Sequence, residues 1–185
     1  MKQRHDSLDN QKRPSLANPR VLTAAALLTA VSFVLAYLAK SIFGPGVIRV
    51  TFECLPVFFG SMVFGPAIGV GIAVAADLLS CLQASMTPNL IVTAGAAVLG
   101  GLSGILFRYL PSRVKLKTRI LLSVTLSHLV GSMLIKSAGL YVYFGWAILW
   151  RIPVYLGIAA AETLLLQYLM TSDALMRQIG KVTQK

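Results

Sequence analysis

Charged residues are scarce in this chain. Only 12% of its 185 residues are Asp, Glu, Lys or Arg, just six are acidic, and 56% are hydrophobic. The mean hydropathy is +0.75. Soluble domains rarely have such a composition, which is typical of membrane proteins with several spans. The sequence therefore predicts a single helical membrane domain.

Cysteine and histidine are also rare, with two of each. Cys54 and Cys81 fall inside apolar runs and match neither a disulfide framework nor a metal-ligand spacing, so we expect reduced, packed side chains and no metal site. His5 lies in a polar N-terminal segment, and His128 is expected to be a hydrogen-bonded residue within a bundle. Without a Walker A sequence, a metalloprotease helix or a dense set of acids, bases and nucleophiles, the chain is not expected to be an enzyme or to hold a cofactor.

Long uncharged runs leave room for about six membrane spans at about 20 residues each. The runs lack the alternation of a membrane β-barrel. The sequence predicts an all-α bundle of six transmembrane helices over residues 20–171, between a disordered tail (1–19) and a second tail (172–185). The expected spans are 20–43, 50–64, 67–82, 89–110, 120–140 and 146–170. The second span is short, which favours a tilted or broken element that is buried in protein or lines a cavity.

Small residues recur at four-residue intervals in several of these spans. Gly65, Gly69 and Ala73 form one such row, Gly100 and Gly104 a second, and Ala26 and Ala30 a third. Such rows let helices approach closely. For the alanine row, close packing inside the same bundle is the simplest interpretation.

The distribution of the basic residues predicts which side of the membrane each terminus and loop faces. Thirteen of the seventeen Lys and Arg residues fall in the N-terminal segment, in the loop between the fourth and fifth spans, or in the C-terminal tail. Cytoplasmic segments are rich in Lys and Arg, so we expect both termini in the cytoplasm. This distribution, without any nucleic-acid-binding motif, also explains the net charge of +11 without a nucleic-acid partner.

The remaining four cations are Lys40, Arg49, Lys136 and Arg151, and each lies near the external end of its span. An anionic ligand that enters from outside would satisfy them, and Arg can hold a carboxylate through two parallel hydrogen bonds. Lys40 is the weakest candidate, because it can simply anchor the end of the first span. The acids of the stretch from Ile48 to Asp77 also lie at membrane depth, where ionisable groups indicate a binding site.

Several motifs together resemble a known family. They are Arg49-x-x-Phe52-Glu53-x-Leu55-Pro56, Phe64-Gly65-Pro66-x-x-Gly69, Asp77-Leu-Leu, Asn89-x-Ile-Val-Thr93-x-Gly95-Ala96 and Arg151-x-Pro153. Over roughly residues 20–170 the chain resembles the substrate-binding S components of energy-coupling-factor (ECF) vitamin transporters, most of all the folate-specific members. The N-terminal histidines of the metal-specific relatives are absent, which argues against nickel or cobalt as the substrate.

The resemblance implies a protein of the prokaryotic cell membrane that captures folate from outside. It would deliver folate by docking on a transmembrane coupling protein with two cytoplasmic ATPases, through a face containing Ala26 and Ala30. Folate has an acidic glutamyl end, an aromatic middle and a pterin edge rich in N–H donors. The expected contacts are Arg49, Lys136 and Arg151 for the carboxylates, Phe52 and Trp150 for stacking, and Glu53, Asp77 or Asn89 for the pterin.

Other functions remain open at this point. Pantothenate, riboflavin or thiamine would suit the same fold, because a fold does not determine its ligand. A proton-coupled carrier would depend on Asp77 or Glu162 titrating within the membrane. A membrane scaffold would need no cluster of external cations.

Overall fold

The computed structural model describes residues 18–43, 50–83, 87–111 and 113–183. The described residues contain helices and no strand. The helices are α2 (Pro19–Phe43), α3 (Cys54–Phe64), α4 (Pro66–Gln83), α5 (Leu90–Tyr109), α6 (Leu116–Ser127), the π-helix η1 (His128–Lys136), α7 (Ser137–Phe144), the 3-10 helix η2 (Gly145–Trp150), α8 (Arg151–Thr171) and α9 (Asp173–Thr183).

Five helical segments are long and apolar enough to cross a membrane. They are α2, α4, α5, the continuous segment Leu116–Ile148, and α8, and α3 is a shorter apolar helix. The prediction of an all-α membrane protein is confirmed. The number of six spans stays a prediction, because it depends on counting α3.

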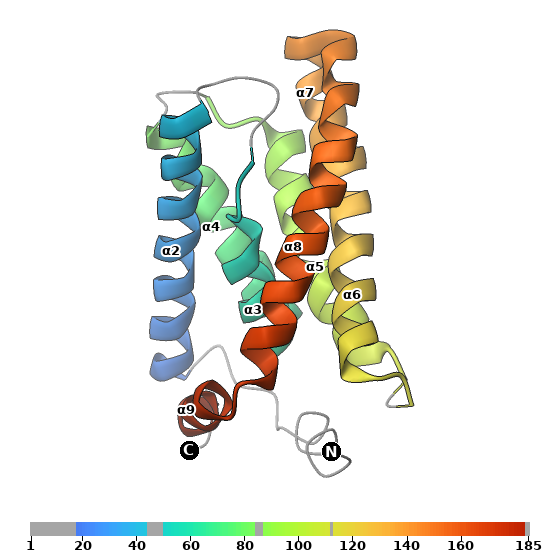
Figure 1. Ribbon diagram of the computed structural model, residues 1–185. Coiled ribbons are helices and arrows are strands. Elements are labelled where there is room, and N and C mark those ends of the chain that lie inside the picture. The colour runs from blue at the N-terminus through green and yellow to red at the C-terminus, as the bar shows by residue number, and fades with distance from the viewer. Residues whose placement is uncertain (1–17, 44–49, 84–86, 112, 184–185) are drawn as a thin grey trace.

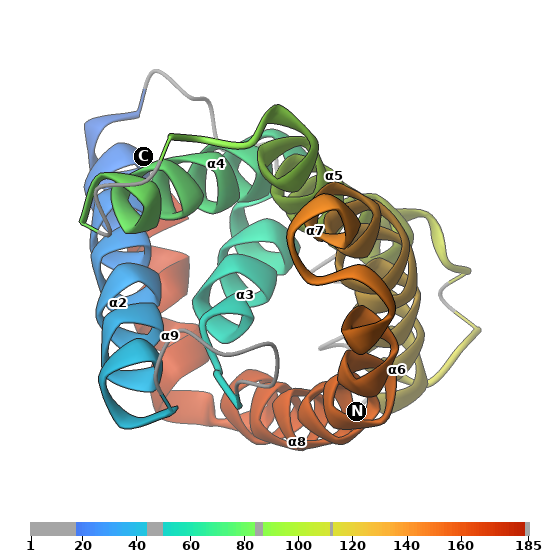
Figure 2. The ribbon, with the colours of Figure 1, turned by 90° about the horizontal axis from the view of Figure 1, so that it is seen from above.

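The helix α3 lies in the middle of the bundle. Figure 2, which looks down the bundle, shows α3 inside a ring formed by α2, α4, α5, α6 with α7, and α8. Its neighbours include α2, α4, α5 and α8, and buried apolar side chains such as Val57, Phe58 and Met62 occupy its surface. A helix that is apolar on all sides belongs in such a position. With 11 residues, α3 is about 16 Å long, roughly half the hydrocarbon thickness, as the short second span predicted.

A sharp turn joins α3 to α4. Gly65 has a φ of 109°, and its N–H donates to the Ser61 carbonyl oxygen at 3.0 Å. Only glycine adopts this conformation readily. Pro66 then begins α4. Proline lacks a backbone N–H, but the N–H of a first helical residue makes no hydrogen bond within the helix, so nothing is lost.

The three helices α3, α4 and α5 approach one another at their glycines. A Cβ atom added to Gly69 would lie 2.4 Å from the Ser61 Cβ, and one added to Gly100 would lie 2.3 Å from the Gly69 carbonyl oxygen. Ser61 Oγ donates a hydrogen bond to the Gly100 carbonyl at 2.5 Å. The prediction that Gly69, Gly100 and Gly104 allow close packing is therefore confirmed.

Apart from Lys40, Lys136 and Arg151, the basic residues of the described chain lie on segments at one end of the bundle. The first turn of α2, the connection from α5 to α6, and α9 all lie at this end in Figure 1. One of these cations, Arg119, joins α6 to α5. It is buried, its Nε donates to the Phe107 carbonyl at 3.2 Å, and its guanidinium carbon lies 4.9 Å from the Phe107 ring centroid. The cytoplasmic location of this end stays a prediction.

The helix α9 differs from the prediction, which assigned residues 172–185 to a tail. The helix lies across the base of the bundle, next to α2 and α8 (Figure 1). Ile179 is buried, and Leu175 and Met176 pack against the same core. These three residues share one face of an 11-residue helix, and burial of that face stabilises a segment too short to be helical alone.

The last long helix begins later than expected. We predicted a span from residue 146, but residues 145–150 form η2 and α8 starts at Arg151. Gly145, with a φ of 52°, ends the preceding helix. Pro153 then falls in the first turn of α8, where proline is tolerated.

Candidate functional site

Charged and polar side chains gather inside the ring, in the half of the bundle away from α9. We call this group the polar cluster. Its members are Glu53, Asp77, Thr93, His128, Lys136, Arg151, Tyr155 and Glu162. They come from the start of α3, from α4 and α5, from η1 and from α8. Within a membrane protein, polar groups at this depth indicate a ligand site.

A buried pair forms the base of the polar cluster. His128 Nε2 and Glu162 Oε2 lie 2.6 Å apart, and their side chains are 1% and 0% exposed. The other ring nitrogen, Nδ1, lies 3.3 Å from Ser132 Oγ, and the Phe58 ring packs edge-on against the imidazole with centroids 5.0 Å apart. The second carboxylate oxygen, Glu162 Oε1, makes no hydrogen bond of normal geometry among the described residues, although the Leu55 backbone N–H lies near the carboxylate. Such a buried acceptor is costly unless something occupies the site.

Arg151 and Tyr155 lie one turn apart on α8. The guanidinium Nη2 donates to the Tyr155 hydroxyl oxygen, and the guanidinium carbon lies 4.9 Å from the Tyr155 ring centroid. Arg151 is only 8% exposed, yet its Nε has no hydrogen-bond partner in the described part of the chain. Because a guanidinium has five donors in a rigid plane, this one retains capacity for an anion.

Lys136 lies among acidic groups. Its ammonium group is within electrostatic range of the Glu53 and Asp77 carboxylates and of the Tyr155 hydroxyl. Asp77 Oδ2 accepts a hydrogen bond from Thr93 Oγ1 at 2.8 Å. Cations and carboxylates from α4, η1 and α8, together with Glu53 just before α3, therefore face one region.

The π-helix η1 supplies two members of the cluster, its first residue His128 and its last residue Lys136. π-Helical turns are rare and often occur at functional sites. The π-helix η1 still packs closely against α5, because Gly131 has no side chain and faces the backbone of Gly95.

The structure places the predicted ligand residues in different ways. Arg49 lies outside the described residues. Glu53, Asp77, Lys136 and Arg151 are in the polar cluster. Phe52 is half-buried beside Glu53, whereas Trp150 is 70% exposed and outside the cluster.

Asn89 and Lys40 have structural contacts. The Asn89 side chain caps α5 by accepting from the Ile91 N–H at 2.9 Å, and it donates to the Gly139 carbonyl of α7 at 3.0 Å. Lys40 Nζ donates to the Ser80 carbonyl at 3.0 Å, which ties α2 to α4 and agrees with the anchoring role considered for this residue.

Tyr155 and Thr93 were not among the predicted site residues, and Glu162 was considered only for a proton carrier. The prediction that His128 is a hydrogen-bonded residue of the bundle is confirmed. A signal was present: Arg151, Tyr155 and Glu162 are spaced by four and seven residues, which places them on one face of a helix. The buried residues Ile158 and Ala159 lie between them.

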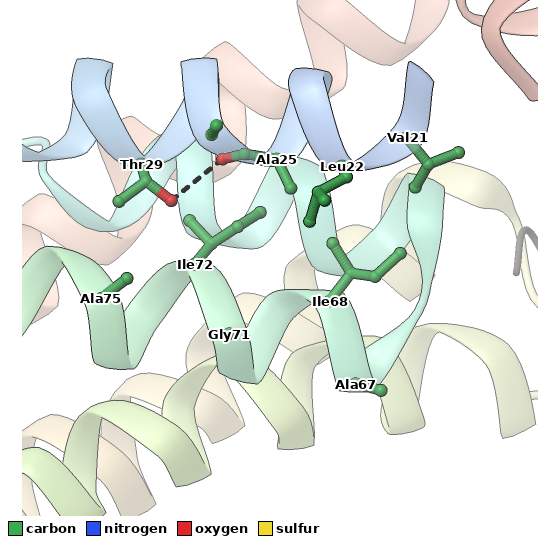
Figure 3. Close-up of a pocket in the computed structure, with 10 residues that line it drawn as sticks. Val21, Leu22, Ala25, Thr29, Ala67, Ile68, Gly71, Ile72 and Ala75 are labelled. Carbon is green, nitrogen blue, oxygen red and sulfur yellow. Dashed lines mark hydrogen bonds between the residues drawn. The ribbon is translucent and has the colours of Figure 1, made fainter. Parts of the chain in front are cut away.

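A second feature lies on the outer surface, near the base of the bundle. A cavity of about 260 Å³ opens between α2 and α4. Figure 3 shows Val21, Leu22 and Thr29 of α2 opposite Ile68 and Ile72 of α4. Ala26 lines this cavity, and Ala26 and Ala30 are both exposed, so neither packs inside the bundle of this chain.

Comparison with known proteins gives one match. The family described as "ECF transporter, substrate-specific component" matches residues 20–176. No curated protein and no solved structure matches the chain.

Proposed function

Since the chain belongs to the family of ECF transporter substrate-specific components, we propose that its polar cluster captures folate from outside the cell. Members of this family are membrane-embedded substrate-binding subunits of ECF transporters and not enzymes. The folate specificity, the contacts and the docking face are our proposals.

The observation that carries the proposal is the mixture of charges in the polar cluster. Lys136 and Arg151 provide cations, and Arg151 retains an unused buried donor. Glu53 and Asp77 provide acceptors in the same region. Folate has the complementary groups at its two ends, carboxylates at one and N–H donors at the other, whereas an uncharged or purely anionic ligand would leave one set unsatisfied.

In this arrangement Arg151 and Lys136, together with Arg49, hold the glutamyl carboxylates. Glu53 and Asp77 accept hydrogen bonds from the pterin edge. Asn89 then acts indirectly, because its cap fixes the first turn of α5 and so positions Thr93, which donates to Asp77.

Aromatic side chains provide the stacking surface for the flat middle of folate. Phe52 is next to Glu53 at the start of α3 and is half-buried. Trp150 is exposed next to Arg151, so its ring is available to pack over a bound ligand. Stacked aromatic pairs contribute about 0.5–1.5 kcal/mol beyond the area that they bury.

Delivery of folate requires the partner complex, and we propose that the α2 face with Ala26 and Ala30 docks on the transmembrane coupling protein. Three features support this face: both alanines are exposed, the adjacent cavity lies between α2 and α4 (Figure 3), and its lining is largely apolar. Small residues allow another helix to approach closely. Two cytoplasmic ATPases would supply the energy.

Co-purification tests the proposal. The protein is expressed in folate-supplied cells, purified in detergent and denatured, and the released small molecule is identified by absorbance and mass. Folate in near-equimolar amount supports the proposal. Release of riboflavin, thiamine or pantothenate instead would redirect it to that vitamin.

A further inference from the structure

Beneath the proposed folate site, three buried side chains from three helices form a compact group of possible metal ligands. They are Cys54 of α3, His128 of η1 and Glu162 of α8, and one ligand atom from each lies within 4.8 Å of the other two. We propose that these residues bind one divalent transition-metal ion of the Zn²⁺ type. His128 and Glu162 form the base of the polar cluster, where the proposed function assigns no folate contact, so the two proposals can be tested separately.

The chemistry of the donors favours such an ion. Thiolate sulfur, imidazole nitrogen and carboxylate oxygen are the ligands that Zn²⁺ prefers, and three protein ligands leave a fourth position. Mg²⁺ and Ca²⁺ prefer oxygen ligands alone. The second carboxylate oxygen, Glu162 Oε1, makes no hydrogen bond of normal geometry among the described residues and can contribute to the remaining coordination.

The burial limits the size of the occupant. Cys54, His128 and Glu162 are 8%, 1% and 0% exposed. A site this deeply buried excludes a ligand as large as a vitamin, whereas a single ion needs only the space between the three ligand atoms. The burial and the closeness of the three ligand atoms therefore favour an ion over a part of the transported substrate.

The charges also balance. A divalent ion with one thiolate, one carboxylate and one neutral imidazole has no net charge, and a buried group without net charge avoids most of the cost of desolvation. Binding releases the Cys54 thiol proton to solvent. Coordination through His128 Nε2 leaves the ring proton on Nδ1. The Nδ1–H can then donate a hydrogen bond to Ser132 Oγ, 3.3 Å away, which fixes the tautomer.

Only small movements are needed. Ligand atoms around a tetrahedral zinc ion lie about 3.3–3.6 Å apart, given metal-ligand distances of about 2.0–2.3 Å. The His128 and Glu162 atoms, 2.6 Å apart, would have to open by about 1 Å, and the Cys54 sulfur would have to approach by a similar amount. The ion would then take the place of the proton between His128 and Glu162 and join α3, η1 and α8.

Cobalt(II) is the probe, because thiolate-bound Co²⁺ absorbs in the near ultraviolet and tetrahedral Co²⁺ absorbs strongly in the visible. The full chain, purified without a histidine tag and treated with chelator, is titrated with Co²⁺. We expect one equivalent to bind with both bands, and Zn²⁺ to displace it. The Cys81→Ser variant is the matched control and should retain both bands, because Cys81 lies on α4, outside the group.

The Cys54→Ser variant should lose the thiolate band. Glu162→Gln should weaken Co²⁺ binding at least about tenfold, because even mutation of residues that only hydrogen-bond to metal ligands has effects of this size. Each variant is checked for a single folded species by gel filtration. If wild type binds no Co²⁺ or Zn²⁺, the proposal is wrong whatever the variants do. A thiolate band that persists in folded Cys54→Ser, or disappears in Cys81→Ser, would also contradict it. Folate binding is measured separately on the same preparations, so failure of one proposal is not mistaken for failure of the other.

Discussion

The Nε2 atom of His128 and the Oε2 atom of Glu162 lie 2.6 Å apart, although the two residues are separated by 34 positions in the chain. Both side chains are sealed from solvent. This contact joins η1 to α8 at the base of the polar cluster.

Replacing one member of this pair should destabilise the bundle. In the presence of a chelator, His128→Leu leaves the Glu162 carboxylate buried without a charged or ring N–H partner. Loss of one partner of a buried pair typically costs about 3–5 kcal/mol. Thermal unfolding in detergent should show a clearly lower melting temperature for His128→Leu, and the double variant His128→Leu/Glu162→Leu should recover part of the loss. A double variant as unstable as the sum of the two single variants would contradict the pairing.

Gly69→Ala should lower the melting temperature, because its Cβ atom would lie 2.4 Å from the Ser61 Cβ and 2.7 Å from the Gly100 carbonyl oxygen. Overpacking of this kind costs about 1–3 kcal/mol. The control is Gly71→Ala on the same helix, where nothing lies within 4 Å of an added Cβ. Gly71→Ala should leave the melting temperature unchanged or raise it slightly, since alanine favours helix. Equal effects of the two changes would show that α4 does not pack as described.

The sequence was informative where a local pattern determines the structure. The apolar runs predicted the long helices, the length of the second run predicted a short element, and the spacing of Gly69 and Gly100 predicted close packing. Each of these features depends on neighbouring residues or on a fixed helical period.

The polar cluster could be predicted only in part. The unusual positions of Lys136 and Arg151 were visible in the sequence, because charge at membrane depth is rare. The contact of His128 with Glu162 was not visible, because it depends on how two distant helices rotate about their axes. Asn89 has an amide side chain that is able to contact a ligand. Only the structure shows that this side chain caps α5 and contacts Gly139.

Arg151→Ala should weaken folate binding far more than Lys40→Ala. Removing one partner of a desolvated charge pair costs about 2–5 kcal/mol, which corresponds to a loss of affinity of about 30-fold to several thousand-fold. Lys40 already donates to the Ser80 carbonyl at the end of α2, so its replacement should change affinity little. Affinities are measured by titration of the purified variants, with Arg49→Ala expected to behave like Arg151→Ala. Small, equal losses for all three cations would mean that they anchor helix ends instead of contacting folate.

Ala26→Trp or Ala30→Trp should abolish transport without abolishing folate capture. Both positions are exposed on α2, and a Trp there would block a partner helix while leaving the polar cluster untouched. Uptake is measured in cells that also express the coupling protein and ATPases, and folate binding is measured on the isolated protein. Ala160→Trp, at an exposed alanine of α8, is the matched control and should retain transport. Unchanged uptake in both α2 variants would rule out docking through this face.

The central claim is that the polar cluster recognises folate, and a binding titration on the isolated chain tests it most directly. The purified protein, freed of any bound ligand by washing and shown to be a single folded species, is titrated with folate, riboflavin, thiamine and pantothenate by calorimetry. We expect saturable binding of one folate per chain, weakened strongly by Arg151→Ala, and no measurable heat with the other three vitamins. Saturable binding of another vitamin with no response to folate would contradict the account.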